Sequence, residues 1–114
     1  MRYAVLIYER PGAYDAFTDE ERRAVSAEYA QLAGDARVVG GARLQGTETA
    51  TTVRVQDQRP LVTDGPFADT KEVFGGFYLL EADDLDAAPD FAGLIPAARL
   101  GGSVEVRPLV EPAP

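Results

Sequence analysis

Short apolar runs separated by polar, turn-forming stretches mark out the elements of this chain. The first run, RYAVLIYE over residues 2–9, is rich in β-branched and aromatic residues and is apolar at both odd and even positions. This pattern predicts a strand that is covered on both faces. The strand is followed by TDEE, in which Thr18 and Glu21 have the spacing of a helix capping box. A helix is therefore expected to follow, and Gly34 is a natural stop for it; its apolar positions recur at helical spacing at Val25, Tyr29, Leu32 and Ala33.

After this helix, the sequence pattern becomes typical of β-strands. RVVGGARL, TATTVRV and PLVTDG are short β-rich pieces separated by turn residues, and QDQR (residues 56–59) has the composition of a hairpin tip. A longer strand, VFGGFYLLEA, continues the predicted sheet. Its Gly75-Gly76 pair predicts a bulge or a close backbone approach.

A second helix is expected near the C-terminus, with a late start. Pro89 would break a helix already running from Asp84, but proline is tolerated in a first turn. We therefore predict that Asp86 is the N-cap and that the helix ends near Gly93. SVEVRPLV (residues 103–110) then alternates apolar and polar residues and predicts the last strand.

The order β, α, strands, α, β predicts a single domain over residues 1–114 with an α+β, ferredoxin-like fold and an antiparallel-rich sheet. Two helices cover only one face of such a sheet. Because the first strand is apolar on both faces, the second face needs another cover, and a second copy of the chain is the simplest one. We therefore expect a homodimer.

Composition narrows the chemistry. The 114 residues carry a formal net charge of −8 and include neither cysteine nor histidine. Disulfides, thiolate metal sites and histidine acid–base catalysis are excluded, and any proton transfer falls to Asp, Glu, Tyr or Lys71. The acidity disfavours nucleic acid and anionic membranes as partners. No cofactor fingerprint or metal motif is present, and we expect a soluble, cytoplasmic protein.

The turn Asp64-Gly65-Pro66-Phe67 is the most distinctive local feature. Asp64 can accept from backbone donors beyond it, Gly65 frees φ, and Pro66 fixes φ, so the bend projects Phe67 in a set direction. One interpretation is structural: Asp64 caps the turn, and Phe67 fills the core or a dimer seam. The other makes Asp64 a general base and Phe67 a pocket wall.

Charged residues downstream of this turn form a second candidate group. Asp69, Lys71 and Glu72 follow closely, and crowded carboxylates push their pKa values apart, as separate acid and base roles require. A solvated loop is the plainer interpretation for Asp69 and Lys71. Glu72 leads into a buried strand and is an equal candidate for structure and catalysis.

Four further residues are candidate ligand contacts. Tyr78 follows the glycine pair and is either core or the wall of a ligand site, and Arg43 follows Gly40-Gly41 as an anion anchor. Glu105 and Arg107 share the face opposite Val104 and Val106. They form an interface ion pair, line a pocket or lie on a solvated edge, and we rank the ion pair first.

The segment VTDGPFADTKEVFGGFYLLEADDLDAA resembles the signature of the DGPF group of YCII-related proteins, and RYAVLIYE, VVGGARL, TATTVRV and GGSVEVRP resemble the flanking segments in the same order. The resemblance implies a dimeric α+β barrel with a pocket near the dimer interface, and members are often encoded beside extracytoplasmic-function sigma factors. Three features depart from the pattern. Histidine is absent, so a His–Asp pair thought to act in some relatives has no counterpart, Asp69 stands where Glu is usual, and Pro89 interrupts the helix.

Two functional hypotheses follow. The first is a small-molecule pocket with metal-free proton-transfer chemistry of isomerase or lyase type, in which Asp64 and Glu72 are the acid–base groups. Phe67, Tyr78 and Arg107 would hold the substrate. The second is a non-enzymatic accessory protein that binds a protein partner, for which the family resemblance suggests a sigma factor.

Overall fold

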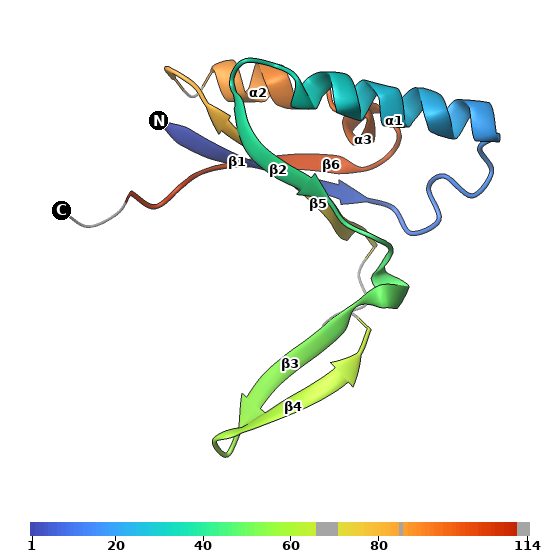
Figure 1. Cartoon of the computed structure of the whole chain (residues 1–114), viewed down its shortest axis with the longest axis vertical. Coiled ribbons are helices and arrows are strands. Elements are labelled where there is room, and N and C mark those ends of the chain that lie inside the picture. Colours follow the sequence, from blue (N-terminus) through green and yellow to red (C-terminus); the bar gives the residue numbers. More distant parts are fainter. Residues whose placement is uncertain (66–70, 85, 112–114) are drawn as a thin grey trace.

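The computed structural model describes residues 1–65, 71–84 and 86–111 of the chain. Within them, a four-stranded antiparallel sheet is covered by helices, and a two-stranded hairpin stands apart from it (Figure 1). In chain order the elements are β1 (Arg2–Glu9), α1 (Asp19–Ala33), β2 (Val38–Arg43), the 3-10 turn η1 (Thr47–Thr49), β3 (Thr51–Gln56), β4 (Arg59–Asp64), β5 (Val73–Glu81), α2 (Ala87–Ala92), α3 (Pro96–Arg99) and β6 (Ser103–Pro108).

The main sheet has the strand order β2-β5-β1-β6, and its neighbouring strands pair antiparallel. With α1 between β1 and β2 and α2 between β5 and β6, this is the βαββαβ arrangement of ferredoxin-like folds. The α+β, ferredoxin-like prediction is confirmed. No helix in the described parts of the chain is long and apolar enough to cross a membrane.

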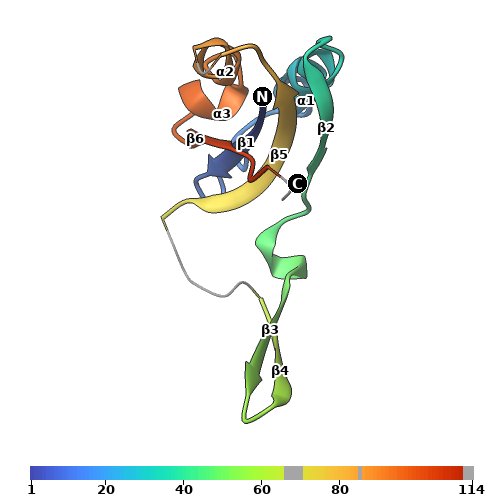
Figure 2. The same ribbon diagram turned by 90° about the vertical axis from the view of Figure 1, so that its left-hand side faces the viewer.

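The core lies between the helices and one face of this sheet (Figure 2). Alternate residues of β1 point into it, because successive side chains of a strand face opposite sides. Tyr3, Val5 and Ile7 are at most 3% exposed, whereas the residues between them are half-buried. The helices contribute Val25, Tyr29, Ala88, Phe91, Ala92 and Ala97, and Ile95 joins them from the turn between α2 and α3. Among the described residues, no helix covers the other face of the sheet.

Both helix predictions are confirmed in their main features. Thr18 Oγ1 accepts from the Glu21 N–H at 3.1 Å while Glu21 Oε1 accepts from the Thr18 N–H at 3.0 Å, which completes the capping box of α1. The second helix begins at Ala87 and is followed by Gly93, so Pro89 lies in its first turn. Asp86 is the N-cap residue, as predicted, but its side chain makes no capping hydrogen bond. Asp84 Oδ1 accepts the Ala87 N–H instead, at 3.0 Å. The short α3 was not predicted.

The prediction that all strands continue one sheet is wrong. β3 and β4 pair only with each other among the described strands. Their tip is nevertheless the predicted one: Asp57 and Gln58 have φ angles of 52° and 65°, as a two-residue hairpin turn requires. We call this hairpin, residues 51–64, the arm.

Glycines set how closely β2, β5 and β1 approach. The pairing of β1 with β5 shifts between Ile7 and Tyr8, so Gly75 is the extra residue of a bulge, as predicted. On β2, Gly41 has φ +143°, and a Cβ there would collide with the Phe77 carbonyl oxygen and lie 3.0 Å from Tyr78 Cα. Only glycine fits this position, because the obstacle is backbone and cannot move aside.

We predict that Gly41→Ala destabilises the protein by about 2–4 kcal/mol, since backbone strain and a steric clash add. Gly93→Ala is the matched control. Gly93 has φ −65°, and a Cβ there would make only ordinary contacts, the nearest at 3.6 Å. Urea unfolding measures both. Equal unfolding midpoints for the two variants would show that the approach of β2 to β5 is not tight.

Candidate functional site

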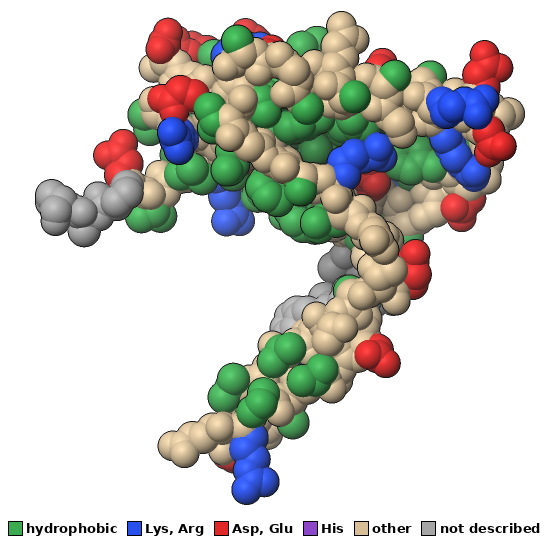
Figure 3. All heavy atoms as spheres, viewed as in Figure 1, with side chains coloured by type: hydrophobic (Ala, Val, Ile, Leu, Met, Phe, Trp, Pro, Cys, Tyr) green, Lys and Arg blue, Asp and Glu red, His purple; other side chains and the backbone are tan. Residues whose placement is uncertain are grey.

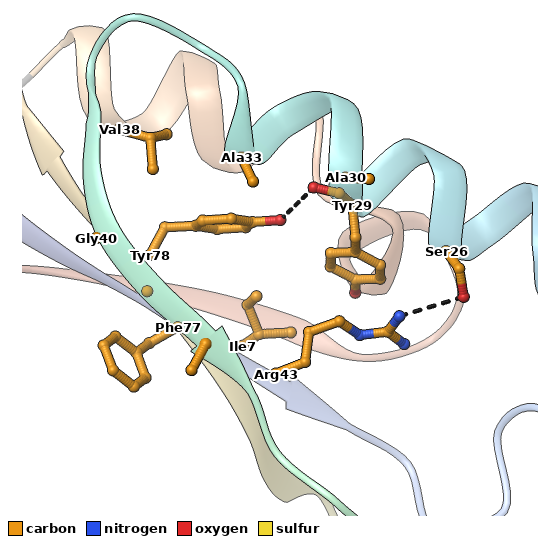
Figure 4. Close-up of a pocket in the computed structure, with 12 residues that line it drawn as sticks. Ile7, Ser26, Tyr29, Ala30, Ala33, Val38, Gly40, Arg43, Phe77 and Tyr78 are labelled. Atoms are coloured by element: carbon orange, nitrogen blue, oxygen red, sulfur yellow. Dashed lines mark hydrogen bonds between the residues drawn. The ribbon is translucent and has the colours of Figure 1, made fainter.

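A cavity of about 500 Å³ lies between α1 and β2 (Figure 4). Its floor comes from the sheet and its roof from the helix. The space is open because the facing residues are small: Ala30 and Ala33 on α1, and Gly40 and Gly41 on β2. The lining residues are Ile7, Ser26, Tyr29, Ala30, Ala33, Val38, Gly40, Gly41, Ala42, Arg43, Phe77 and Tyr78.

Arg43, the last residue of β2, is the cationic group of the cavity. One guanidinium nitrogen, Nη1, donates to Ser26 Oγ at 3.2 Å, and the guanidinium carbon lies 4.7 Å from the centre of the Tyr29 ring. This stacking is a cation–π contact, which holds the side chain without neutralising it. Within the described residues, no Asp or Glu forms an ion pair with Arg43. Its charge therefore remains available to a ligand.

Tyr78 lies on the sheet side of the cavity. It is 7% exposed, and its hydroxyl donates to the Tyr29 carbonyl oxygen at 2.8 Å. Its ring meets the Phe91 ring edge to face, with 5.6 Å between the centres. Burial raises the pKa of Tyr78. The side chain is thus a core residue and a cavity wall together, so the two interpretations of Tyr78 do not exclude each other.

A carboxylate shared by two phenols lies close to the cavity. Glu9, at the end of β1, accepts on Oε1 from the Tyr14 hydroxyl at 2.8 Å and from the Tyr29 hydroxyl at 3.4 Å. Its other oxygen lies where Gly75 has no side chain, since a Cβ there would be 3.2 Å from Glu9 Oε2. The bulge on β5 therefore makes room for this carboxylate. We call Glu9, Tyr14 and Tyr29 the carboxylate–phenol cluster.

A smaller cavity, about 200 Å³, is lined by Tyr14 of this cluster and by Arg43. It is also lined by Arg22, Val25 and Ser26. Ser26 and Arg43 also line the larger cavity, so the two spaces adjoin at these side chains. Arg22 fixes the loop at the cavity mouth, because its guanidinium donates to the Tyr14 carbonyl oxygen at 3.0 Å.

The electrostatics of the cluster keep both phenols protonated. Burial raises the pKa of Tyr14 far above its ordinary value, and its hydrogen bond to Glu9 adds to this effect. Burial likewise raises the pKa of Tyr29, and the negative charge of Glu9 raises it further. A nearby carboxylate disfavours a second negative charge. Both hydroxyls are therefore donors at neutral pH.

Sequence reasoning missed this cluster. Tyr14 lies in a loop, Tyr29 has the spacing of a core residue, and Glu9 ends an apolar strand. The one available signal was Glu9 itself, a charged residue directly after a run that is buried on one face.

The other predicted site residues lie in different places. Glu72 lines a separate cavity of about 630 Å³ and accepts from Ser103 Oγ at 2.6 Å. Asp64 is exposed at the end of β4, opposite Thr51, and lines neither this cavity nor the one between α1 and β2. Phe67, like Pro66 and Asp69, lies outside the described residues.

Glu105 and Arg107 form an ion pair, with 3.4 Å between Glu105 Oε1 and Arg107 Nε. Val104 and Val106 pack against the core, so the charged pair lies on the helix-free face of the sheet. Of the predicted ligand contacts that the structure describes, then, only Arg43 and Tyr78 line one cavity together. Within the described residues, no three acidic side chains gather in a metal-binding arrangement.

The family follows from comparison with known sequences. Residues 1–112 match the model of the YCII-related domain. The chain belongs to the YCII-related family. This YCII-related protein is 41% identical to an uncharacterized protein, R00369, of Rhizobium meliloti (strain 1021), over 96% of this chain and 92% of that one. The similarity to this relative thus covers nearly the whole length of both chains.

A solved structure shares the fold of this YCII-related protein. It is 5-chloro-2-hydroxyhydroquinone dehydrochlorinase (TftG) from Burkholderia phenoliruptrix AC1100, in complex with 2,5-dihydroxybenzoquinone. The TM-score is 0.56 at 19% identity, and the match covers 98% of this chain and 96% of the other. At this identity the similarity establishes a common fold.

We predict that Tyr14→Phe lowers stability by about 1 kcal/mol at neutral pH, because the bond to Glu9 is lost. This deficit shrinks at alkaline pH. The pKa of Tyr14 is raised on folding, so the wild type has its full stability below the ordinary pKa of 10.0 and loses it as the pH rises further. The phenylalanine variant lacks this loss. Urea unfolding near pH 7 and at about pH 10.5 compares the two proteins, and a constant difference would contradict the prediction.

Proposed function

We propose that this YCII-related protein binds a small organic anion in the cavity between α1 and β2 and acts on it by proton transfer, in a lyase or isomerase type of reaction. The observation that carries the proposal is the position of Arg43. The chain has a net charge of −8, yet this cavity carries a guanidinium. Among the described residues, no carboxylate forms an ion pair with it, so its positive charge can attract an anionic ligand. Arginine binds carboxylates and similar planar anions through paired donors.

The dimensions and walls of the cavity favour a compact, largely apolar ligand. About 500 Å³ falls within the range of small-molecule sites, which is about 300–1,000 Å³. Ile7, Val38 and the alanines of α1 provide apolar contact, and Arg43 provides one charged end. We infer a flat molecule with an anionic edge, such as an ionised hydroxyquinone or an aromatic acid.

The carboxylate–phenol cluster supports the proton-transfer part of the proposal. Tyr14 lines the smaller cavity, and its proton is directed at Glu9. When Tyr14 accepts a proton from a ligand carbon, its own proton passes to Glu9, so negative charge never rests on the phenol. This relay needs a carboxylate within hydrogen-bond distance, and the Glu9–Tyr14 separation of 2.8 Å meets that condition. Asp64 and Glu72 stay predictions as acid–base residues.

The structural neighbour supports the reaction class. Its name describes a dehydrochlorinase, an enzyme that eliminates hydrogen chloride, and its bound molecule is a dihydroxyquinone. Elimination begins with removal of a proton, which a carboxylate relay performs without a histidine. The same quinone is ionised at neutral pH and is small and flat, so it is a suitable first probe.

We predict that 2,5-dihydroxybenzoquinone binds the wild type and that Arg43→Gln weakens the affinity at least about tenfold, the equivalent of about 1.4 kcal/mol. Isothermal titration calorimetry measures the dissociation constants. Arg23→Gln is the matched control, because Arg23 is exposed on α1 and lines neither cavity at Arg43. It removes the same charge from the protein. Equal loss in both variants would reduce the effect to net charge and remove Arg43 as the anchor.

We further predict that the wild type accelerates exchange of the ring hydrogens of this quinone with solvent deuterium, as followed by proton NMR. The exchange adds a deuteron to a ring carbon and then removes the original proton from it. Glu9→Gln slows the exchange while binding is kept within about threefold, because the amide neither supplies nor takes the relayed proton. Glu81→Gln, a change to an exposed carboxylate bonded to Arg2, is the control. Binding without accelerated exchange in the wild type would overturn the proton-transfer role and leave the binding role intact.

A further inference from the structure

The arm has an apolar face that the described residues of the chain leave open. In the pairing of β3 with β4, Val53 lies opposite Val62 and Val55 opposite Pro60. Residues opposite each other in an antiparallel pair point to the same side, so these four form one face. The three valines are 58%, 73% and 63% exposed in chain order. Apolar side chains stand along the arm in Figure 3.

The opposite face of the arm is more polar. Thr52 lies opposite Thr63, and Arg54 lies opposite Leu61. An alternation of this kind is typical of a strand pair with one buried and one solvated face. The arm therefore has the sequence of a covered hairpin and stands uncovered.

The arm also extends away from the main sheet (Figures 1 and 2). The radius of gyration of the chain is 16.1 Å, against about 13 Å for a compact domain of this length. A two-stranded hairpin is at best marginally stable by itself in water. Something must cover the valine face for the arm to be a lasting part of the structure.

The same chain carries a second open apolar surface, on the helix-free face of the main sheet. Tyr8, Phe74 and Phe77 form an aromatic row there, with ring centres 5.7 Å and 6.4 Å apart. Leu6, which pairs with Phe77, points the same way. Tyr8, Phe77 and Leu6 are half-buried and Phe74 is 38% exposed, and no helix in the described part of the chain covers this face. Exposed apolar surfaces of this kind mark protein–protein contacts, and this chain carries two of them.

We propose that two copies of the chain exchange arms, so that the valine face of each arm lies on the aromatic row of its partner. A second copy is the occupant that these surfaces favour, because one chain supplies both halves of the contact and a two-fold pair uses each half twice. Two such contacts bury both open surfaces at once. The arm is also joined to the cavity along the chain, because residues 44–50 link Arg43, at the end of β2, to the start of β3.

Size-exclusion chromatography with light scattering tests the proposal at micromolar concentration. The wild type is expected to be a dimer, and Val62→Lys is expected to raise the dimer dissociation constant at least about tenfold, since a charge would be buried in an apolar contact. Thr63→Lys is the matched control. It adds the same charge one residue along the same strand, on the opposite face, and is expected to leave the dimer intact. A monomeric wild type, or equal effects of the two variants, would overturn the proposal.

Chemical cross-linking tests the exchange itself. Because the chain has no cysteine, Val62→Cys and Phe74→Cys each introduce one thiol. A mixture of the two single variants, treated with a short bismaleimide and analysed by mass, is expected to yield the mixed cross-linked pair. A dimer without this product places the interface elsewhere. In the double variant, a cross-link confined to one chain would show that the arm folds back on its own sheet. Either result overturns the arm exchange.

Discussion

The hydrogen bond from the Tyr78 hydroxyl to the Tyr29 carbonyl oxygen joins the middle of the sheet to the middle of α1, and the site depends on it. It sets how far the helix stands from β5 and which way Tyr29 points. From that position the Tyr29 ring supports the Arg43 guanidinium, while its hydroxyl reaches Glu9. Loss of this bond would loosen the placement of Tyr29, which contacts both Arg43 and Glu9, while the core contacts of Val25 and Tyr29 would still hold the helix on the sheet.

Local signals in the sequence predicted the elements well, because their causes are local. The capping box needs only residues 18–21, and Pro89 limits where α2 begins through its own ring. The separate arm was missed because alternation shows that a strand has two unlike faces, and does not show which surface covers the apolar one. The short α3 was missed because a single turn carries too little periodicity to recognise.

The site was predicted only in part, for a similar reason. Arg43 and Tyr78 were found because neighbouring glycine pairs mark backbone positions with room beside them. Glu9 was missed because its meaning comes from Tyr14, Tyr29 and Gly75, three residues from different segments of the chain. The turn around Asp64 drew attention through its unusual composition, and composition alone does not locate a turn relative to a cavity.

The two walls of the cavity differ in how freely they can change. On the β2 side the boundary is backbone, since Gly41 admits no side chain next to Phe77 and Tyr78. On the α1 side, Ala30 and Ala33 are exposed and lie outside the buried core. Larger or polar residues at these helix positions would reshape the space at little cost to folding. If the cavity binds a ligand as proposed, its selectivity can therefore be changed from the helix side, while the close approach of β2 to β5 holds the strand side fixed.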